Sequence, residues 1–189
     1  MNPGDGGVND PGLFARDLAG FVTALHRVAP ENGPASYRSE PLGARDAETR
    51  AAIGALRGTV DTVAATAVWE ASLEAPAWPG PTVWVHADLQ PGNLLVDGGR
   101  LSAVIDFGCL GLGDPAVDLI AAWYVLPARA RGVFRAALGV DDAAWARGRG
   151  WALSVALAEL SSYRDTNPVM AGVARHVIGE VLAEPIRTP

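Results

Sequence analysis

Polar residues near the middle of the chain have the types and the spacing that chemistry on a hydroxyl or a phosphate group requires. His86, Asp88 and Asn93 lie in the sequence HADLQPGN, and Asp106 opens a later Asp-Phe-Gly. Carboxylate and amide oxygens are the ligands that Mg²⁺ prefers in proteins, and a loop carboxylate can accept the proton of a hydroxyl group. We therefore expect Asp88 to act as a proton acceptor, and Asn93 and Asp106 to hold a magnesium ion.

A predicted β-hairpin brings these residues together. Leu94–Val96 and Leu101–Ile105 are apolar runs joined by Asp-Gly-Gly-Arg, and glycine adopts the positive φ that tight hairpin turns require. If the two glycines form a two-residue loop, Asn93 lies opposite Val104 and close to Asp106. The polar residues then gather at the open end of the hairpin.

These motifs resemble those of one family of enzymes. His86-x-Asp88-x-x-x-x-Asn93 resembles the catalytic loop of kinases, and Asp106-Phe107-Gly108 resembles their metal-binding Asp-Phe-Gly. With HADLQPGNLLV, IDFG and GDPAVDL in this order, the chain looks like the aminoglycoside phosphotransferase and choline-kinase-like family, which shares the protein-kinase fold. The resemblance extends more loosely over nearly the whole chain and covers only the C-terminal lobe of that fold.

The resemblance implies a mostly α (α+β) fold, a protein-kinase-like C-terminal lobe with six or seven helices around the small hairpin and no N-terminal lobe. We expect residues 1–9 to form a disordered tail and residues 10–189 to form a single domain. Apolar periodicity and capping residues predict helices at about 11–29, 45–73 with a division at Gly58 or Asp61, 115–126, 128–138, 143–163 and 169–182. A short β-branched run, Thr82–Val85, predicts a strand before the loop.

The resemblance also implies roles for individual residues. Asp88 would orient and deprotonate the acceptor hydroxyl, with Asn93 and Asp106 holding Mg²⁺ at the phosphates. Leu95 and Ile105 stand where related kinases have the floor of the adenine site, although core packing explains both equally well. Gln90 stands where many relatives carry a second histidine, which is a departure from the family pattern.

Further polar residues have structural or substrate-binding interpretations. His86 is expected to buttress the loop, Asp114 to cap a helix, and Asp118 to tie a buried helix to the loop. Acidic residues on late helices of the family recognise amine-bearing substrates, which makes Glu159 and Asp165 candidate substrate residues. A solvated helix end is the alternative for these two.

The totals exclude some classes of partner. The net charge of −6 argues against a nucleic-acid surface and is compatible with cationic substrates. A single cysteine, Cys109, excludes an internal disulfide and favours a cytoplasmic location. No apolar run approaches the length of a membrane span.

The fifteen basic residues are all arginine. Kinases of this fold hold the nucleotide phosphates with an N-lobe lysine beneath a glycine-rich loop, and we read Gly4-Asp5-Gly6-Gly7 as part of the tail rather than as such a loop. The implied reaction is transfer of the γ-phosphoryl group of ATP, or GTP, to a hydroxyl of a small molecule such as an aminoglycoside. Without that lysine we expect little or no activity from this chain alone.

Two other functions remain open from the sequence. The chain could be a non-catalytic remnant or binding module that self-associates, or pairs with a missing N-lobe, through the apolar face that the N-lobe normally covers. Metal-assisted hydrolysis without nucleotide is a weaker alternative. Among acceptors, sugars, aminoglycosides, macrolides, choline-like amines and amino alcohols all fit the motifs.

Overall fold

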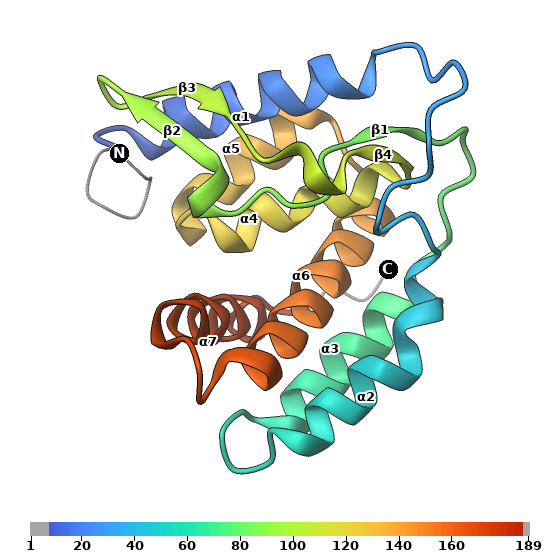
Figure 1. Ribbon diagram of the computed structural model, residues 1–189, viewed down its shortest axis with the longest axis vertical. Coiled ribbons are helices and arrows are strands. Elements are labelled where there is room, and N and C mark those ends of the chain that lie inside the picture. The colour runs from blue at the N-terminus through green and yellow to red at the C-terminus, as the bar shows by residue number, and fades with distance from the viewer. Residues whose placement is uncertain (1–7, 187–189) are drawn as a thin grey trace.

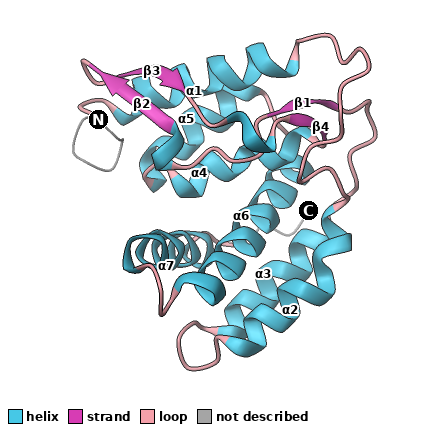
Figure 2. Cartoon of the chain, in the orientation of Figure 1, coloured by secondary structure: helices cyan, strands magenta, loops and turns pink. Residues whose placement is uncertain are grey.

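A computed structural model describes residues 8–186 of the protein (Figure 1). This part is mostly helical, with a few short strands (Figure 2). The α-helices are α1 (Pro11–His26), α2 (Asp46–Ala55), α3 (Thr62–Glu74), α4 (Ala121–Tyr124), α5 (Ala128–Leu138), α6 (Asp142–Tyr163) and α7 (Pro168–Ala183), and the strands are β1 (Val83–Val85), β2 (Leu94–Asp97), β3 (Arg100–Val104) and β4 (Gly111–Gly113). Most of the predicted tail, and the glycine cluster within it, lies outside the described residues.

Short polar side chains set where the helices begin. Asp10 Oδ1 accepts hydrogen bonds from the backbone N–H groups of Gly12 and Leu13, so it satisfies donors that have no partner within α1. The predicted helix over 45–73 is divided, as expected, between α2 and α3. Gly58 has φ +82° in the connection, and the Asp61 side chain caps α3.

The hairpin of β2 and β3 is present, but its register differs by one residue from the prediction at the open end. Asp97 faces Arg100 as expected, and an irregularity between Leu95 and Val96 shifts the pairing beyond it. The Ile105 N–H donates to the Asn93 carbonyl at 2.9 Å, so Asn93 lies opposite Ile105 and not Val104. The bulged strand carries one extra residue, and turn geometry alone could not predict it.

Two other local features differ from the sequence prediction. β1 pairs with β4 in a second antiparallel ladder, which was missed because Gly-Leu-Gly carries no strand signal. The predicted helix over 115–126 is a 3₁₀ helix from Pro115 to Ile120 followed by α4. Gly148 of α6 crosses this segment so closely that a Cβ there would lie 2.5 Å from the Leu119 Cβ.

The long helix α6 runs through the centre of the molecule, with α2 and α3 on one side and α7 on the other (Figure 1). The hairpin, α1, α4 and α5 form the other part of the molecule, above α6 in this view. Fully buried tryptophans at positions 69, 123 and 151 belong to the continuous core. None of the helices between residues 8 and 186 combines the length and the apolar composition needed to cross a lipid bilayer.

Candidate active site

The buried carboxylate of Asp118 forms hydrogen bonds with the backbone of the loop after β1. Asp118 is fully buried and accepts hydrogen bonds from the backbone N–H groups of His86 at 3.1 Å and Ala87 at 2.7 Å. His26 Nε2, from the end of α1, lies 2.9 Å from the same carboxylate. Because Ala87 has φ +63° without being glycine, these bonds help to hold a loop conformation that is intrinsically unfavourable.

The His86 ring is fully buried and braces the loop against the Asp-Phe-Gly segment. Its Nδ1 accepts from the Asp88 N–H at 3.3 Å, so the proton lies on Nε2, which donates to the Ile105 carbonyl at 3.1 Å. The Phe107 ring packs edge-on against it, with 4.9 Å between ring centroids. Both ring nitrogens are therefore engaged in the scaffold, which leaves the imidazole without a free atom for proton transfer.

The carboxylate of Asp88 is held by three side chains. Its Oδ2 accepts from Asn93 Nδ2 at 2.9 Å and from Gln90 Nε2 at 3.0 Å. Its Oδ1 lies 3.0 Å from Nη1 of Arg38, which comes from the segment between α1 and α2. The Asp88 side chain remains partly exposed, with 18% of its surface accessible, so a hydroxyl group can still reach it.

Asn93 and Asp106 carry side-chain oxygens at the open end of the hairpin, where the residue before Asp106 is bonded to Asn93. Asn93 is buried, and its amide nitrogen donates to both the carbonyl and the carboxylate of Asp88, so Oδ1 is the atom left for a cation. Asp106 is exposed, has φ +61°, and accepts from the Gly108 N–H at 3.3 Å. Within residues 8–186 no group of three His, Cys, Asp or Glu side chains could hold a metal ion. One amide and one carboxylate nevertheless suit Mg²⁺, which keeps several waters and completes its shell with substrate phosphates.

The residues expected at the nucleotide base lie on an exposed apolar face beside this site. Leu95, Ile105 and Phe107 are large hydrophobic side chains with 37%, 41% and 44% of their surfaces accessible. These side chains are therefore not fully buried in the core, and core packing accounts for only part of the surface of Leu95 and Ile105.

Cys109 follows the Asp-Phe-Gly segment. Burial raises the pKa of its thiol, which makes it a poor nucleophile.

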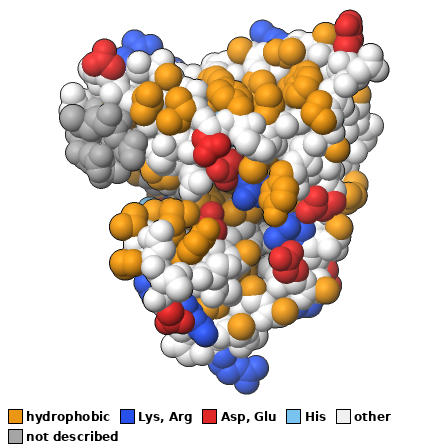
Figure 3. Space-filling view, in the orientation of Figure 1, with side chains coloured by type: hydrophobic (Ala, Val, Ile, Leu, Met, Phe, Trp, Pro, Cys, Tyr) orange, Lys and Arg blue, Asp and Glu red, His pale blue; other side chains and the backbone are white. Residues whose placement is uncertain are grey.

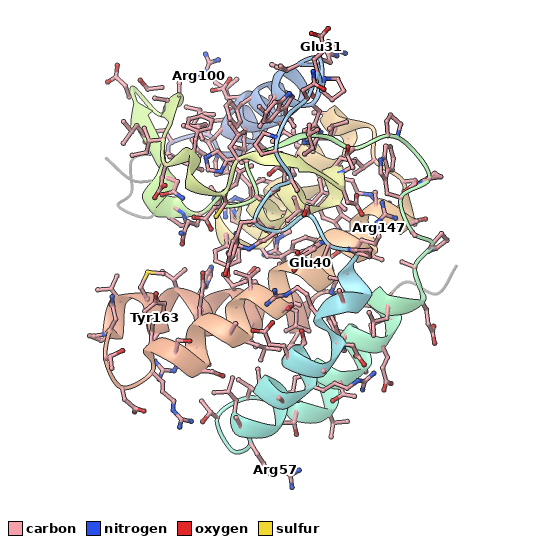
Figure 4. All side chains as sticks on the ribbon, turned by 45° about the vertical axis from the view of Figure 1, so that its right-hand side comes forward. Glu31, Glu40, Arg57, Arg100, Arg147 and Tyr163 are labelled. Carbon is pink, nitrogen blue, oxygen red and sulfur yellow. The ribbon has the colours of Figure 1, made fainter. Side chains whose placement is uncertain are left out.

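The two candidate substrate residues lie in different surroundings. Glu159 on α6 is partly buried and accepts a hydrogen bond from the Tyr124 hydroxyl at 2.8 Å. Burial raises the pKa of the Glu159 carboxyl, and the charges of Arg38 and Asp88 also influence it. Asp165 lies in the turn after Tyr163 (Figure 4), where its side chain is 81% exposed and pairs with Arg164.

Figure 3 shows acidic side chains beside a hollow between the part that carries the hairpin and the part formed by α6 and α7. Asp114 has two partners: its Oδ1 accepts from the Ala116 N–H at 2.9 Å and its Oδ2 from Arg147 Nε at 2.8 Å. Arg147 is buried and also donates to the Pro76 carbonyl on the loop that leads to β1 (Figure 4).

Sequence reasoning missed two residues of this site. Arg38 lies in a loop rich in proline, glycine and serine, and no motif marks it as a partner of Asp88. His26 carries no motif that marks it as a partner of the buried Asp118, with which it pairs. Both contacts join positions at least fifty residues apart, which local patterns do not reveal.

The sequence from residue 4 to residue 151 matches the model of the phosphotransferase enzyme family. The chain belongs to this family. No curated protein matches it. The family assignment confirms the resemblance inferred from the three motifs.

Solved structures from the phosphotransferases share the fold of this chain at low sequence identity. The GDP complex of aminoglycoside 2'-phosphotransferase-IIIa has a TM-score of 0.63 at 16% identity, over 95% of this chain and 66% of the other. Macrolide 2'-phosphotransferase MphH from Brachybacterium faecium gives 0.53 at 22%, over 95% and 63%, and the gentamicin complex of APH(2")-IIa gives 0.54 at 15%, over 93% and 63%. These likenesses confirm the mostly helical, kinase-like C-lobe fold, and the chain spans less than two thirds of each structure.

In this phosphotransferase-family chain, the buried position of Glu159 predicts a pH effect on stability. A carboxyl whose pKa is higher in the folded than in the unfolded state stabilises the fold only at low pH, and this contribution is lost as pH rises from 4.5 through the folded-state pKa. Glu159→Gln keeps an acceptor for Tyr124 but cannot ionise. We expect the thermal unfolding midpoint of Glu159→Gln, relative to that of the wild type, to rise as pH increases from 4 to 8. A difference between the two midpoints that does not change with pH would contradict this.

Proposed function

We propose that this chain carries the acceptor-binding and proton-accepting half of a small-molecule phosphotransferase, which transfers the γ-phosphoryl group of ATP or GTP to a hydroxyl. The observation that supports this most is the convergence of Asp88 with Asn93 and the Asp106 segment at the open end of the hairpin. A phosphotransferase needs little covalent participation from the protein, because positioning and charge neutralisation supply most of the rate.

Asp88 would orient the acceptor hydroxyl and take its proton. Its carboxylate is held on Oδ2 by Asn93 and Gln90, so an acceptor oxygen within hydrogen-bond distance meets a base that is already oriented. Asn93 Oδ1 and the Asp106 carboxylate would hold Mg²⁺. When bound, this ion would neutralise the charge of the nucleotide phosphates.

Leu95 and Ile105 would form one side of the nucleotide-base site, since both offer apolar surface next to Asn93 and Asp106. Support for a nucleotide donor also comes from the similar solved structure of aminoglycoside 2'-phosphotransferase-IIIa, which is a GDP complex. With no lysine in the chain, we expect calorimetry to give an affinity for Mg·ATP weaker than micromolar.

Glu159 is the better candidate for acceptor recognition. It lies near enough to Asp88 and Arg38 for their charges to act on it, whereas Asp165 pairs with Arg164 at an exposed turn. An ammonium or hydroxyl group of an acceptor could take the remaining capacity of the Glu159 carboxylate. The similar structures include a gentamicin complex and a macrolide 2'-phosphotransferase, so aminoglycosides and macrolides are the first acceptors to test.

The decisive experiment measures phosphorylated acceptor by mass spectrometry, which detects slow turnover. The purified chain is incubated with Mg·ATP or Mg·GTP and a panel of aminoglycosides, macrolides and amino alcohols. We expect slow, acceptor-dependent phosphorylation by the wild type and a loss of about 10²–10⁴-fold in Asp88→Asn, because the proton acceptor is removed. Glu70→Gln, on the outer helix α3, serves as the matched control and should leave the rate unchanged.

An equal rate in Asp88→Asn, or no product from any acceptor, would contradict the proposal. The alternative is then a binding module that self-associates, which the exposed side chains of Leu95, Ile105 and Phe107 favour. Native mass spectrometry separates the two: a stable dimer that loses affinity when Phe107 is changed to serine supports the binding module. A monomer that phosphorylates an acceptor supports the enzyme.

A further inference from the structure

A strap, which we define as residues 34–39, crosses the molecule beside the candidate site. It joins β4 through two backbone bonds, from Ser36 N–H to the Leu112 carbonyl at 3.0 Å and from Leu112 N–H to the Pro34 carbonyl at 2.8 Å. At Gly111 a Cβ would lie 2.4 Å from the Ser36 nitrogen. The strap therefore approaches β4 more closely than any residue other than glycine would allow at this position.

The strap contacts both halves of the site. The Ser36 hydroxyl is buried and donates to the Cys109 carbonyl at 2.7 Å, immediately after Asp106-Phe107-Gly108. Two residues later, Arg38 Nη1 donates to Asp88 Oδ1 at 3.0 Å and to the Ala87 carbonyl. Six consecutive residues thus join the segment with the expected metal ligand to the loop with the expected proton acceptor.

The contacts of Arg38 restrict the loop more than a surface ion pair does. Ala87, which has a positive φ, is bonded at its N–H by Asp118 and at its carbonyl by Arg38. The Arg38 side chain is only 13% exposed, and its own N–H donates to the Ser36 hydroxyl at 3.2 Å. The Arg38 guanidinium is partly buried and donates to two acceptors, so it has less conformational freedom than an exposed guanidinium. Its bond to Asp88 therefore restricts the position of the carboxylate.

We propose that the strap sets the distance between Asp88 and the Asp106 segment, and that Arg38 is the positioning residue through which it does so. This inference rests on the proposed phosphotransfer function. Asn93 and Gln90 hold Oδ2 of Asp88 from within the loop itself, whereas Arg38 ties Oδ1 to a separate part of the chain. Displacement of a reacting group by about 1 Å can cost about 10²-fold in rate.

The test compares Arg38→Met and Arg38→Lys with Arg50→Met. Arg50 is the matched control, because it forms ion pairs with Asp46 and Glu70 on the outer helices α2 and α3. In the acceptor-phosphorylation assay we expect Arg38→Met to lower kcat by about 10²-fold with KM for the nucleotide unchanged, and Arg38→Lys to restore part of the loss. A purely structural role would lower the folded fraction and leave kcat per folded molecule unchanged.

A second measurement keeps the inference testable if the wild type proves inactive. The backbone N–H groups of Gln90 and Asn93 donate within the loop, and hydrogen exchange reports their protection. We expect about tenfold faster exchange at both in Arg38→Met and no change in Arg50→Met. Unchanged exchange, or an unchanged kcat in Arg38→Met, would overturn the role of the strap, whereas an inactive wild type with faster exchange in Arg38→Met would overturn the proposed function alone.

Discussion

Replacing Asp118 with alanine is expected to lower the free energy of unfolding by about 3–5 kcal/mol, a large part of the stability of a typical domain. The fully buried carboxylate accepts from two backbone N–H groups and from His26. Alanine would leave the two backbone N–H groups buried without a partner, and each unsatisfied group costs about 1–3 kcal/mol. The loss falls on the loop that carries Asp88, so we also expect acceptor phosphorylation to fall.

Urea denaturation followed by far-UV circular dichroism measures the effect. Asp165→Ala is the control, since this exposed aspartate pairs only with a neighbouring arginine at a turn, and surface changes of this kind stay within about 0.5 kcal/mol. The free energy of unfolding of Asp118→Asn should lie between those of Asp118→Ala and Asp165→Ala. The amide oxygen of asparagine can still accept a hydrogen bond, whereas its NH₂ group would face another donor and cannot accept from it. If Asp118→Ala is as stable as Asp165→Ala, the buried tie does not hold the loop.

Replacing Arg147 with methionine is the second change with a large expected effect. Arg147 lies buried on α6 and donates to the Asp114 carboxylate and to the Pro76 carbonyl. Breaking a fully buried ion pair from one side costs about 3–5 kcal/mol, and the cost should be somewhat smaller here because the Asp114 side chain keeps 19% of its surface exposed. We expect Arg147→Met to unfold at a lower urea concentration than the wild type, since the partly buried Asp114 carboxylate would then face an apolar side chain.

A double-mutant cycle isolates the pair. Asp114→Asn together with Arg147→Met removes both charges while keeping a side-chain oxygen that can cap the Pro115 helix. We expect the double variant to be more stable than Arg147→Met alone, because the remaining cost is then that of lost hydrogen bonds rather than of a buried charge. Strict additivity of the two single changes would show that the charges do not interact.

The sequence alone was sufficient for the family and the fold class. The catalytic-loop and Asp-Phe-Gly patterns are local, and the hairpin between them depends on two neighbouring glycines, so short-range rules could place Asn93 near Asp106. Helix starts were equally readable, since a capping aspartate such as Asp10 or Asp61 acts on the next three residues. The sequence left open whether Leu95 and Ile105 pack in the core, and only the structure shows both side chains partly exposed.

Only the tertiary structure decided which residues support Asp88. Arg38 reaches it from the strap and His26 reaches Asp118 from the end of α1, across separations that no local pattern encodes. The one-residue shift in the hairpin comes from the irregularity opposite β3, between Leu95 and Val96. β4 pairs with β1 on one side and bonds to the strap on the other. Sequence patterns report the preferences of neighbours along the chain, whereas these contacts arise from packing between segments, and packing exists only once the chain has folded.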